Sequence, residues 1–144
     1  MRVRYCFLLG LLAIVGCGPN VAPVSGKITL DDKPLAGATV IFTPESEDKN
    51  PGPGSNAKTD ASGQYMLQLN TGGTKGAIIG KHRVRITAYE GDDNEIPSSG
   101  SDMKVFRKLL IPDRYNSQTE LTIEVPAGGT TSANFELKSD GKGK

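Results

Sequence analysis

The chain has 144 residues, and 17 Lys and Arg side chains nearly balance 16 Asp and Glu side chains. Such a balanced charge, formally +1, argues against a general role in binding nucleic acid or anionic surfaces, because these are bound by strongly basic surfaces. His82 is the only histidine, so a three-histidine zinc site is impossible and a catalytic triad incomplete. We expect a non-enzymatic protein without a cofactor.

The first 16 residues have the organisation of an export signal. Arg2 and Arg4 precede an uncharged apolar run from Phe7 to Gly16. Ten residues are too few for a membrane-spanning helix, which needs roughly 20, but they suit the apolar region of a secretory signal. The run also lacks the polar face of an amphipathic core helix. Residues 1–16 are therefore predicted to be a signal peptide, helical before its removal.

The apolar run ends in the tetrapeptide Ile14-Val15-Gly16-Cys17, which resembles the bacterial lipobox. The resemblance implies that the sulfur of Cys17 is thioether-linked to diacylglycerol. It also implies cleavage before Cys17 and acylation of the new amino terminus. More than one acyl chain is needed because a single chain anchors only marginally. An ordinary signal peptide with a chance cysteine is the alternative.

Residues 17–20 are then a short lipidated tether. The segment Gly18 to Asn20 spans at most ~11 Å at ~3.6 Å per residue, so the domain is expected close to the lipid surface. Gly18, rather than Asp, follows the cysteine, which by analogy with other lipoproteins favours the outer membrane of the bacterial cell envelope.

Loss of the signal removes Cys6 and leaves no thiol in the mature domain if Cys17 is lipidated. An exported fold without disulfides depends on its hydrophobic core alone. A thiol nucleophile and a cysteine-bound metal are likewise excluded. Loss of Arg2 and Arg4 changes the net charge to 15 − 16 = −1.

From residue 21 onward, short runs alternate apolar and polar residues and end at turn residues, which predicts an all-β domain of antiparallel strands. One apolar face per strand suits two sheets packed face to face. The seven predicted strands are residues 24–30, 38–43, 56–59, 64–69, 81–88, 121–125 and 133–137. Turns are predicted at Asp31–Pro34, Asp60–Gly63 and Pro126–Gly129.

Two segments outside the strands are predicted to be flexible. Asn70 to Gly80 is a connection rich in Gly and Thr, and Ser139 to Lys144 has no apolar residue and is predicted to be a disordered tail.

The polar segment Glu90–Asp102 is too polar to bury, and loops of this length are usually functional or disordered. A functional loop and a disordered loop are both compatible with the sequence. Beyond it, Met103, Phe106 and Leu110 fall at helical spacing, and a short helix and an edge segment are both compatible with the sequence up to Pro112.

Several segments together resemble one family. They are Val24-x-Gly26-x-Ile28, DDKPLAGATVIF (31–42), KTDASGQYML (58–67), GKHRVRI (80–86), IPDRY (111–115) and LTIEV (121–125). This pattern, over residues 21–138, resembles the carboxypeptidase regulatory-like domain, a seven-stranded antiparallel transthyretin-like (prealbumin-like) β-sandwich. It is similar in particular to small bacterial lipoproteins made of one such domain. His82 departs from the pattern, because an aromatic residue is expected after Gly-Lys.

The residues that carry the resemblance have physical roles in the expected fold. Gly26 allows a close backbone approach or a bulge, and Gly63 takes a positive φ in a turn. Pro34 and Gly37 shape the connection between the first two strands. Tyr65 is amphipathic and is expected at the edge of the core.

Candidate chemical sites are few. His82 lies on the inward face of its strand and is expected to replace a core aromatic. The stripe Lys81, Arg83 and Arg85 is either a solvated face or protects an edge strand by charge, and a polyanion or partner site is the less favoured alternative. Asp92, Asp93, Glu95 and Asp102 offer oxygen ligands for calcium but share one loop, so a solvated acidic loop is favoured.

Two activities of related sandwiches are not expected. A Lys27–Asn134 isopeptide bond is disfavoured because both residues fall on predicted outward faces, away from any dry site. Hydroxyisourate hydrolase, a transthyretin-like enzyme, would require several histidines and a Tyr-Arg-Gly-Ser end that this chain lacks.

The sequence therefore predicts a non-enzymatic lipoprotein of the bacterial envelope, anchored in a membrane through Cys17. Its expected role is binding or assembly with an unknown envelope protein or glycan. A carbohydrate- or peptide-binding module is the alternative, although the absence of Trp makes aromatic sugar platforms scarce.

Overall fold

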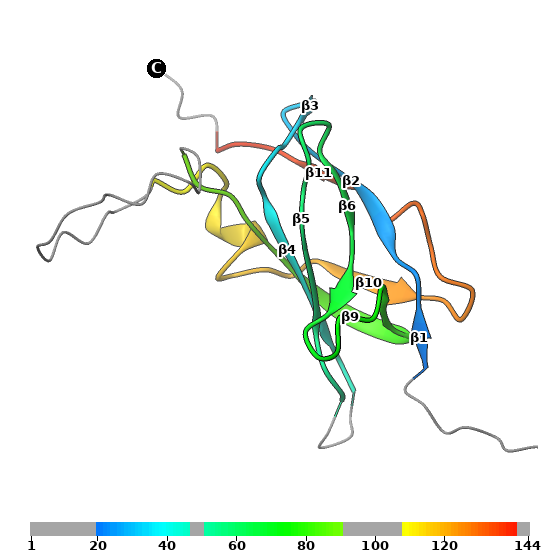
Figure 1. Ribbon diagram of the computed structural model, residues 1–144. Helices are drawn as coiled ribbons and strands as arrows, with labels where there is room; N and C mark the ends of the chain where they lie inside the picture. The colour runs from blue at the N-terminus through cyan, green and yellow to red at the C-terminus, as the bar shows by residue number, and fades with distance from the viewer. Residues whose placement is uncertain (1–19, 47–50, 91–107, 141–144) are drawn as a thin grey trace, which may run out of the picture.

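The computed structural model describes residues 20–46, 51–90 and 108–140, and this part of the chain is all-β (Figure 1). Its one helical element is the 3-10 turn η1 (Asp113–Tyr115). Within the same residues no helix is long and apolar enough to cross a bilayer. The strands are β1 (Val21–Ala22), β2 (Ser25–Leu30), β3 (Lys33–Pro34), β4 (Thr39–Pro44), β5 (Ser55–Lys58), β6 (Gln64–Met66), β7 (Gln68–Leu69), β8 (Ala77–Ile78), β9 (Gly80–Thr87), β10 (Thr122–Val125) and β11 (Phe135–Leu137).

The larger sheet has the strand order β10-β9-β4-β5-β7 and is antiparallel throughout. Phe42 of β4 lies opposite Val84 of β9 on one side and Ser55 of β5 on the other. The second sheet is built around β2, which pairs with β11 on one side and with β3 and β6 on the other. The short strands β1 and β8 form a separate antiparallel pair.

A single hydrophobic core is shared by these sheets, and the predicted alternation of buried and exposed residues is confirmed. Val40 and Phe42 of β4 and Val84 and Ile86 of β9 have no exposed surface, whereas the residues between them point outward or are partly covered. The β2 side supplies Val24 and Ile28, and other large buried side chains include Tyr65, Leu67, Val125 and Leu137. Burying alternate residues is the arrangement expected when each sheet has one face on the core.

All seven predicted strands are present, and one of them is shared by both sheets. Residues 64–69 are interrupted at Leu67, so that β6 pairs with β2 while β7 pairs with β5. The backbone of Leu67 is satisfied outside both ladders, because its N–H donates to the carbonyl of Val24 at 2.9 Å and its carbonyl accepts from Gly76 N–H at 2.7 Å. The chain therefore links the two sheets at this point.

The prediction that all strands are antiparallel is wrong for β11, which runs parallel to β2. After β10 the chain follows the start of β2: Thr130 N–H donates to the carbonyl of Pro23, and Ser25 N–H donates to the carbonyl of Thr130, both at 2.9 Å. The connection thus enters the second sheet from the end at which β2 begins, and β11 must run in the same direction.

The prediction of a flexible connection at residues 70–80 is also wrong in part. Ala77 is fully buried, and Ala77–Ile78 forms β8 against β1. Three apolar residues, 77–79, after a stretch of glycines and threonines give too short a pattern to predict a strand, and the pairing needs a partner far away in the sequence.

The end of the chain is ordered further than predicted. Ser139 and Asp140, assigned above to the tail, contact the domain: Ser139 N–H donates to Asp31 Oδ1 at 3.1 Å, and Arg114 forms an ion pair with Asp140. Residues 141–144 lie outside the described residues. Leu109 forms a bridge with Tyr89, which supports the edge-segment alternative for Leu110, while Met103 and Phe106 are not among the described residues.

The closest backbone approach in the second sheet occurs at Gly26. A Cβ atom on Gly26 would lie 2.0 Å from the carbonyl oxygen of Ala133, well inside any real contact distance. The same oxygen accepts a hydrogen bond of 2.6 Å from the buried Tyr65 hydroxyl. The sequence-based expectation of a close approach at Gly26 is confirmed, and Gly63 has the expected positive φ of 76°.

Gly26→Ala should lower the free energy of unfolding by about 3 kcal/mol, because the added methyl group forces the Ala133 segment away from β2 and from Tyr65. Urea denaturation of the Cys17→Ala protein measures the change. Gly128→Ala is the matched control, since a Cβ there meets nothing within 4 Å, and it should stay within about 0.5 kcal/mol of the parent. Equal stability of the two variants would contradict the proposed packing.

Candidate functional site

Several predicted site residues fall outside the described residues. These are the lipidation site Cys17 and the calcium candidates Asp92, Asp93, Glu95 and Asp102. Among residues 20–46, 51–90 and 108–140, no three His, Cys, Asp or Glu side chains lie close enough to hold a metal ion.

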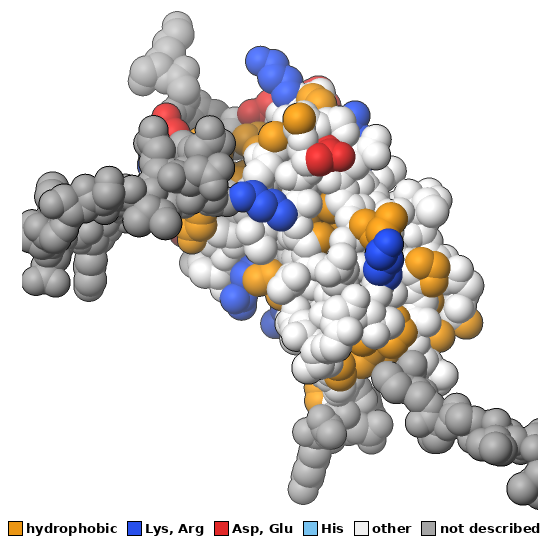
Figure 2. Space-filling model, viewed as in Figure 1, with side chains coloured by type: hydrophobic (Ala, Val, Ile, Leu, Met, Phe, Trp, Pro, Cys, Tyr) orange, Lys and Arg blue, Asp and Glu red, His pale blue; other side chains and the backbone are white. Residues whose placement is uncertain are grey.

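The described chain is held to the domain from its first residue. The carbonyl of Asn20 accepts a hydrogen bond of 2.8 Å from Ile79 N–H, and β1 follows directly. The folded domain therefore begins three residues after Cys17 in the sequence. Hydrophobic side chains gather at this end of the molecule, at the lower right of Figure 2.

The described residues that precede and follow the long polar segment are in contact. Glu90 N–H donates to the carbonyl of Lys108 at 2.9 Å, and Lys108 Nζ lies 3.8 Å from Glu90 Oε2. The bridge between Tyr89 and Leu109 lies next to this contact. Glu90 and Lys108, which flank residues 91–107 in the sequence, are thus held together beyond the end of β9.

The predicted basic stripe is exposed on the outer face of the larger sheet but is partly neutralised. Arg83 donates from Nε to Glu45 Oε1 at 2.8 Å, and Lys81 Nζ lies 3.5 Å from Glu45 Oε2. The hydrogen bond from Arg83 holds the pKa of Glu45 below its usual value. Arg85 makes no ion pair with a described residue, so the stripe offers less positive charge to a polyanion than three isolated cations.

His82 is buried in the core, as predicted. It has no exposed surface, and its ring centroid lies 5.8 Å from that of Phe42. Nδ1 is 3.0 Å from the carbonyl of Gly80, whereas Nε2 has no hydrogen-bond partner among the described residues. Burial lowers the pKa of His82, opposed by the Gly80 carbonyl and by the charge of Glu124. The ring is therefore a neutral core residue.

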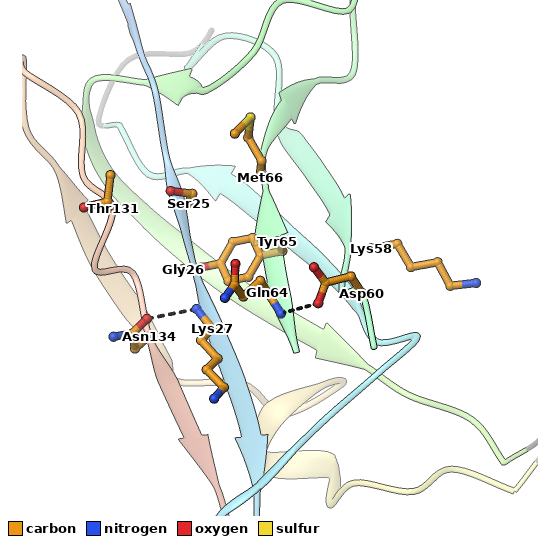
Figure 3. A pocket seen from close by; sticks show the side chains of 10 residues that line it. All are labelled: Ser25, Gly26, Lys27, Lys58, Asp60, Gln64, Tyr65, Met66, Thr131 and Asn134. Atoms are coloured by element: carbon orange, nitrogen blue, oxygen red, sulfur yellow. Dashed lines mark hydrogen bonds between the residues drawn. The ribbon is translucent and has the colours of Figure 1, made fainter. Parts of the chain in front are cut away.

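One surface depression is an open groove of about 610 Å³ over β2 and β6 (Figure 3). Gly26 and Tyr65 lie at its centre, and Met66 is 55% exposed beside them. Its polar lining comes from β2, β5, β6, the turn before β6 and the segment leading into β11: Ser25, Lys27, Lys58, Asp60, Gln64, Thr131 and Asn134.

Hydrogen bonds fix two opposite sides of this groove. On the β11 side, Asn134 Oδ1 accepts from the backbone N–H of Lys27 at 2.9 Å. On the other side, Asp60 Oδ1 accepts from the Ser62 hydroxyl at 2.7 Å and from Gln64 N–H at 2.9 Å. These bonds, that from the Ser62 hydroxyl first, lower the pKa of Asp60 and keep it ionised. The groove therefore presents a fixed carboxylate and amide beside lysine side chains.

Lys27 and Asn134, the pair considered above for an isopeptide bond, lie side by side at this groove. The Asn134 carboxamide oxygen is used by the backbone of Lys27, and both residues are exposed. An exposed pair has none of the dry surroundings that such a reaction requires, in agreement with the sequence-based interpretation.

The chemistry of the groove is that of hydrogen bonding and charge. Its lining contains hydroxyl groups but no histidine or cysteine side chain that could activate them. The groove was not predicted from the sequence, although three of its residues, Ser25, Lys27 and Asn134, were assigned to outward faces of predicted strands. The register that places Gly26 beside Tyr65 and Lys27 beside Gln64 is the missing information, and no local pattern supplies it.

No family model, no curated protein and no solved structure matches this chain in comparisons with known proteins.

The burial of His82 predicts acid sensitivity. Because its pKa is lower in the folded chain than the ordinary 6.5, protons bind the unfolded chain more tightly. The free energy of unfolding should fall as pH drops below about 6.5, by up to about 1.4 kcal/mol per pH unit. Urea denaturation at several pH values between 7 and 5 measures this slope.

His82→Leu is the matching control, because leucine fills the site and does not titrate. Its stability should be nearly independent of pH over the same range. The carboxyl groups with lowered pKa, Asp31, Asp60 and Glu45, have ordinary values of 3.8 to 4.5 and contribute only in more acidic solution. A slope that persists in His82→Leu would contradict the assignment.

Proposed function

We propose that this protein is a non-enzymatic lipoprotein of the bacterial envelope, exported by residues 1–16 and anchored in a membrane through Cys17. The observation that carries the proposal is the position of Cys17, between an apolar signal-like run and a domain whose first residue, Asn20, is already bonded to Ile79. Cleavage before Cys17 would remove nothing from the described fold. The outer membrane remains the favoured location because Gly18 follows the cysteine.

We also propose that the domain has a specific type of β-sandwich fold. Seven main strands in two sheets, with Gly26 at a close approach and Gly63 at positive φ, support a transthyretin-like β-sandwich of the carboxypeptidase regulatory-like type. The parallel pairing of β11 with β2 departs from the all-antiparallel sandwich that was expected.

The domain's role in this proposal is binding or assembly at the envelope. The alternative is a carbohydrate- or peptide-binding module, and the groove over β2 and β6 is the observation that favours it. Its volume of about 610 Å³ lies within the range of ligand sites, roughly 300–1,000 Å³. Its fixed polar groups suit hydroxyl, amide or charged ligand groups. Tyr65 is buried at its centre, so no aromatic ring is offered for sugar stacking.

Cys17→Ala should abolish membrane attachment. In the parent bacterium or a heterologous host, the unchanged protein is expected in the membrane fraction after a high-salt wash and in the detergent phase on extraction. Cys6→Ala is the control and should behave as the unchanged protein, because residue 6 is removed with the signal. Retention of the Cys17→Ala protein in washed membranes would contradict the proposed anchor.

The groove can be tested on glycan and peptide arrays with the Cys17→Ala protein. If the module binds such ligands, Lys27→Glu combined with Gln64→Ala should weaken any positive signal at least about tenfold, the effect of losing about 1.4 kcal/mol of binding free energy. Arg85→Glu, on the outer face of the other sheet, is the control and should leave the signal unchanged. Binding that is lost only in the Arg85 variant would place the binding site on the outer face of the larger sheet instead of in the groove.

A further inference from the structure

The two ends of the sheets differ in composition, and the chain enters the domain at one of them. The base is defined as residues 20–23, 44–46, 51–54, 70–80 and 125–129, and the far end as residues 31–38, 59–63, 88–90, 108–119 and 137–140. The register shows that the base is one end of the molecule, because Pro44 pairs with His82 and Val125 pairs with Gly80. Asn20 joins this end through Ile79.

The proposed anchor leaves the base little freedom to move away from lipid. This step depends on the proposed function, in which Cys17 carries the acyl chains. Only Gly18 and Pro19 separate Cys17 from Asn20, so the Cα atoms of Cys17 and Asn20 are at most ~11 Å apart. The length of strand β9, eight residues, separates base from far end by about 23 Å at ~3.3 Å per residue.

Charge distinguishes the two ends. The base contains one carboxylate, Glu45, which is paired with Arg83 and Lys81, and one further charged side chain, Lys75. The far end carries six carboxylates and four cations, so its formal net charge is 4 − 6 = −2, against 1 − 1 = 0 at the base. The carboxylates are Asp31, Asp32, Asp60, Glu90, Asp113 and Asp140, and the cations are Lys33, Lys108, Arg114 and Lys138. Three of these carboxylates are paired there, in Lys108–Glu90, Arg114–Asp140 and Lys138–Asp32. An anionic phospholipid surface repels carboxylates within a Debye length of about 8 Å. Such a surface should therefore repel the base less than the far end.

Partly exposed apolar side chains are present in the base, as they are at the far end, where Tyr89 and Leu110 are exposed. Val21, Pro53 and Ile78 retain solvent contact there, and Gly52 packs so closely on Ile78 that a Cβ at Gly52 would meet its Cδ1 atom at 2.4 Å. Figure 2 shows orange side chains gathered at this end. Small uncharged residues make up most of the remainder, and they can approach lipid headgroups without burying a charge.

We propose that the base is a membrane-apposed surface that rests on the phospholipid headgroups beside the anchor. The far end, with its formal net charge of −2, then points away from the bilayer, together with the contact between Glu90 and Lys108, which flank residues 91–107 in the sequence. The surface offered to other envelope molecules is therefore the far end and the sides of the sheets.

Site-directed fluorescence on the full-length lipidated protein tests this orientation. The mature lipidated chain has no free thiol, so Thr71→Cys in the base and Lys33→Cys at the far end each accept a single fluorophore, and both positions are exposed. Each labelled protein is reconstituted into vesicles of phosphatidylethanolamine and phosphatidylglycerol that contain a headgroup-nitroxide lipid.

Quenching at residue 71 is expected to exceed that at residue 33 by roughly threefold or more, given the separation of about 23 Å. Equal quenching, or stronger quenching at residue 33, in protein that floats with the vesicles would overturn the proposed orientation. The base would then be a surface available to a second copy of this chain or to another protein. Failure of the lipidated protein to float with vesicles would instead overturn the proposed anchor itself, as would equal flotation of a Cys17→Ala version.

Discussion

The second sheet depends on the contact between Gly26 and Ala133. With no side chain at residue 26, the segment before β11 comes within hydrogen-bonding distance of β2, where Ala133 N–H donates to the Ser25 carbonyl at 3.1 Å. The Tyr65 hydroxyl then reaches the Ala133 carbonyl at 2.6 Å. That hydrogen bond satisfies a polar group inside the core, where an unpaired one would cost about 1–3 kcal/mol. Strands β2, β6 and β11 are held together at this point.

This arrangement also determines what the surface of the sheet can offer. Because β11 enters beside the start of β2, Asn134 is placed next to Lys27, and Gly26 leaves the shallow floor between them and Gln64. The groove is thus a consequence of the close approach at Gly26. At the same end of the fold, β1 and β8 hold Asn20, so the proposed anchor and the entry of the chain into the core are next to each other.

The strands and their buried faces could be predicted because period-two alternation is local: Val40 and Phe42 are read from their own neighbours and are buried. Features that depend on pairing distant segments could not. Ala77–Ile78 becomes a strand only because β1 lies beside it, and β11 is parallel only because its connection follows Pro23. The groove needs the register of β2 against β6. Among candidate site residues, the burial of His82 followed from its strand, whereas the pairing of Glu45 with Arg83 did not.

The intact mass of the protein purified from membranes reports directly on the proposed modification of Cys17. We expect a chain that begins at Cys17 with added diacylglycerol and amide-linked acyl mass, and a thioether that resists reduction. An unmodified mass, with a free thiol at residue 17 or with residues 1–16 still attached, would contradict it. The domain would then be a secreted or signal-bearing β protein whose attachment to membranes has another cause.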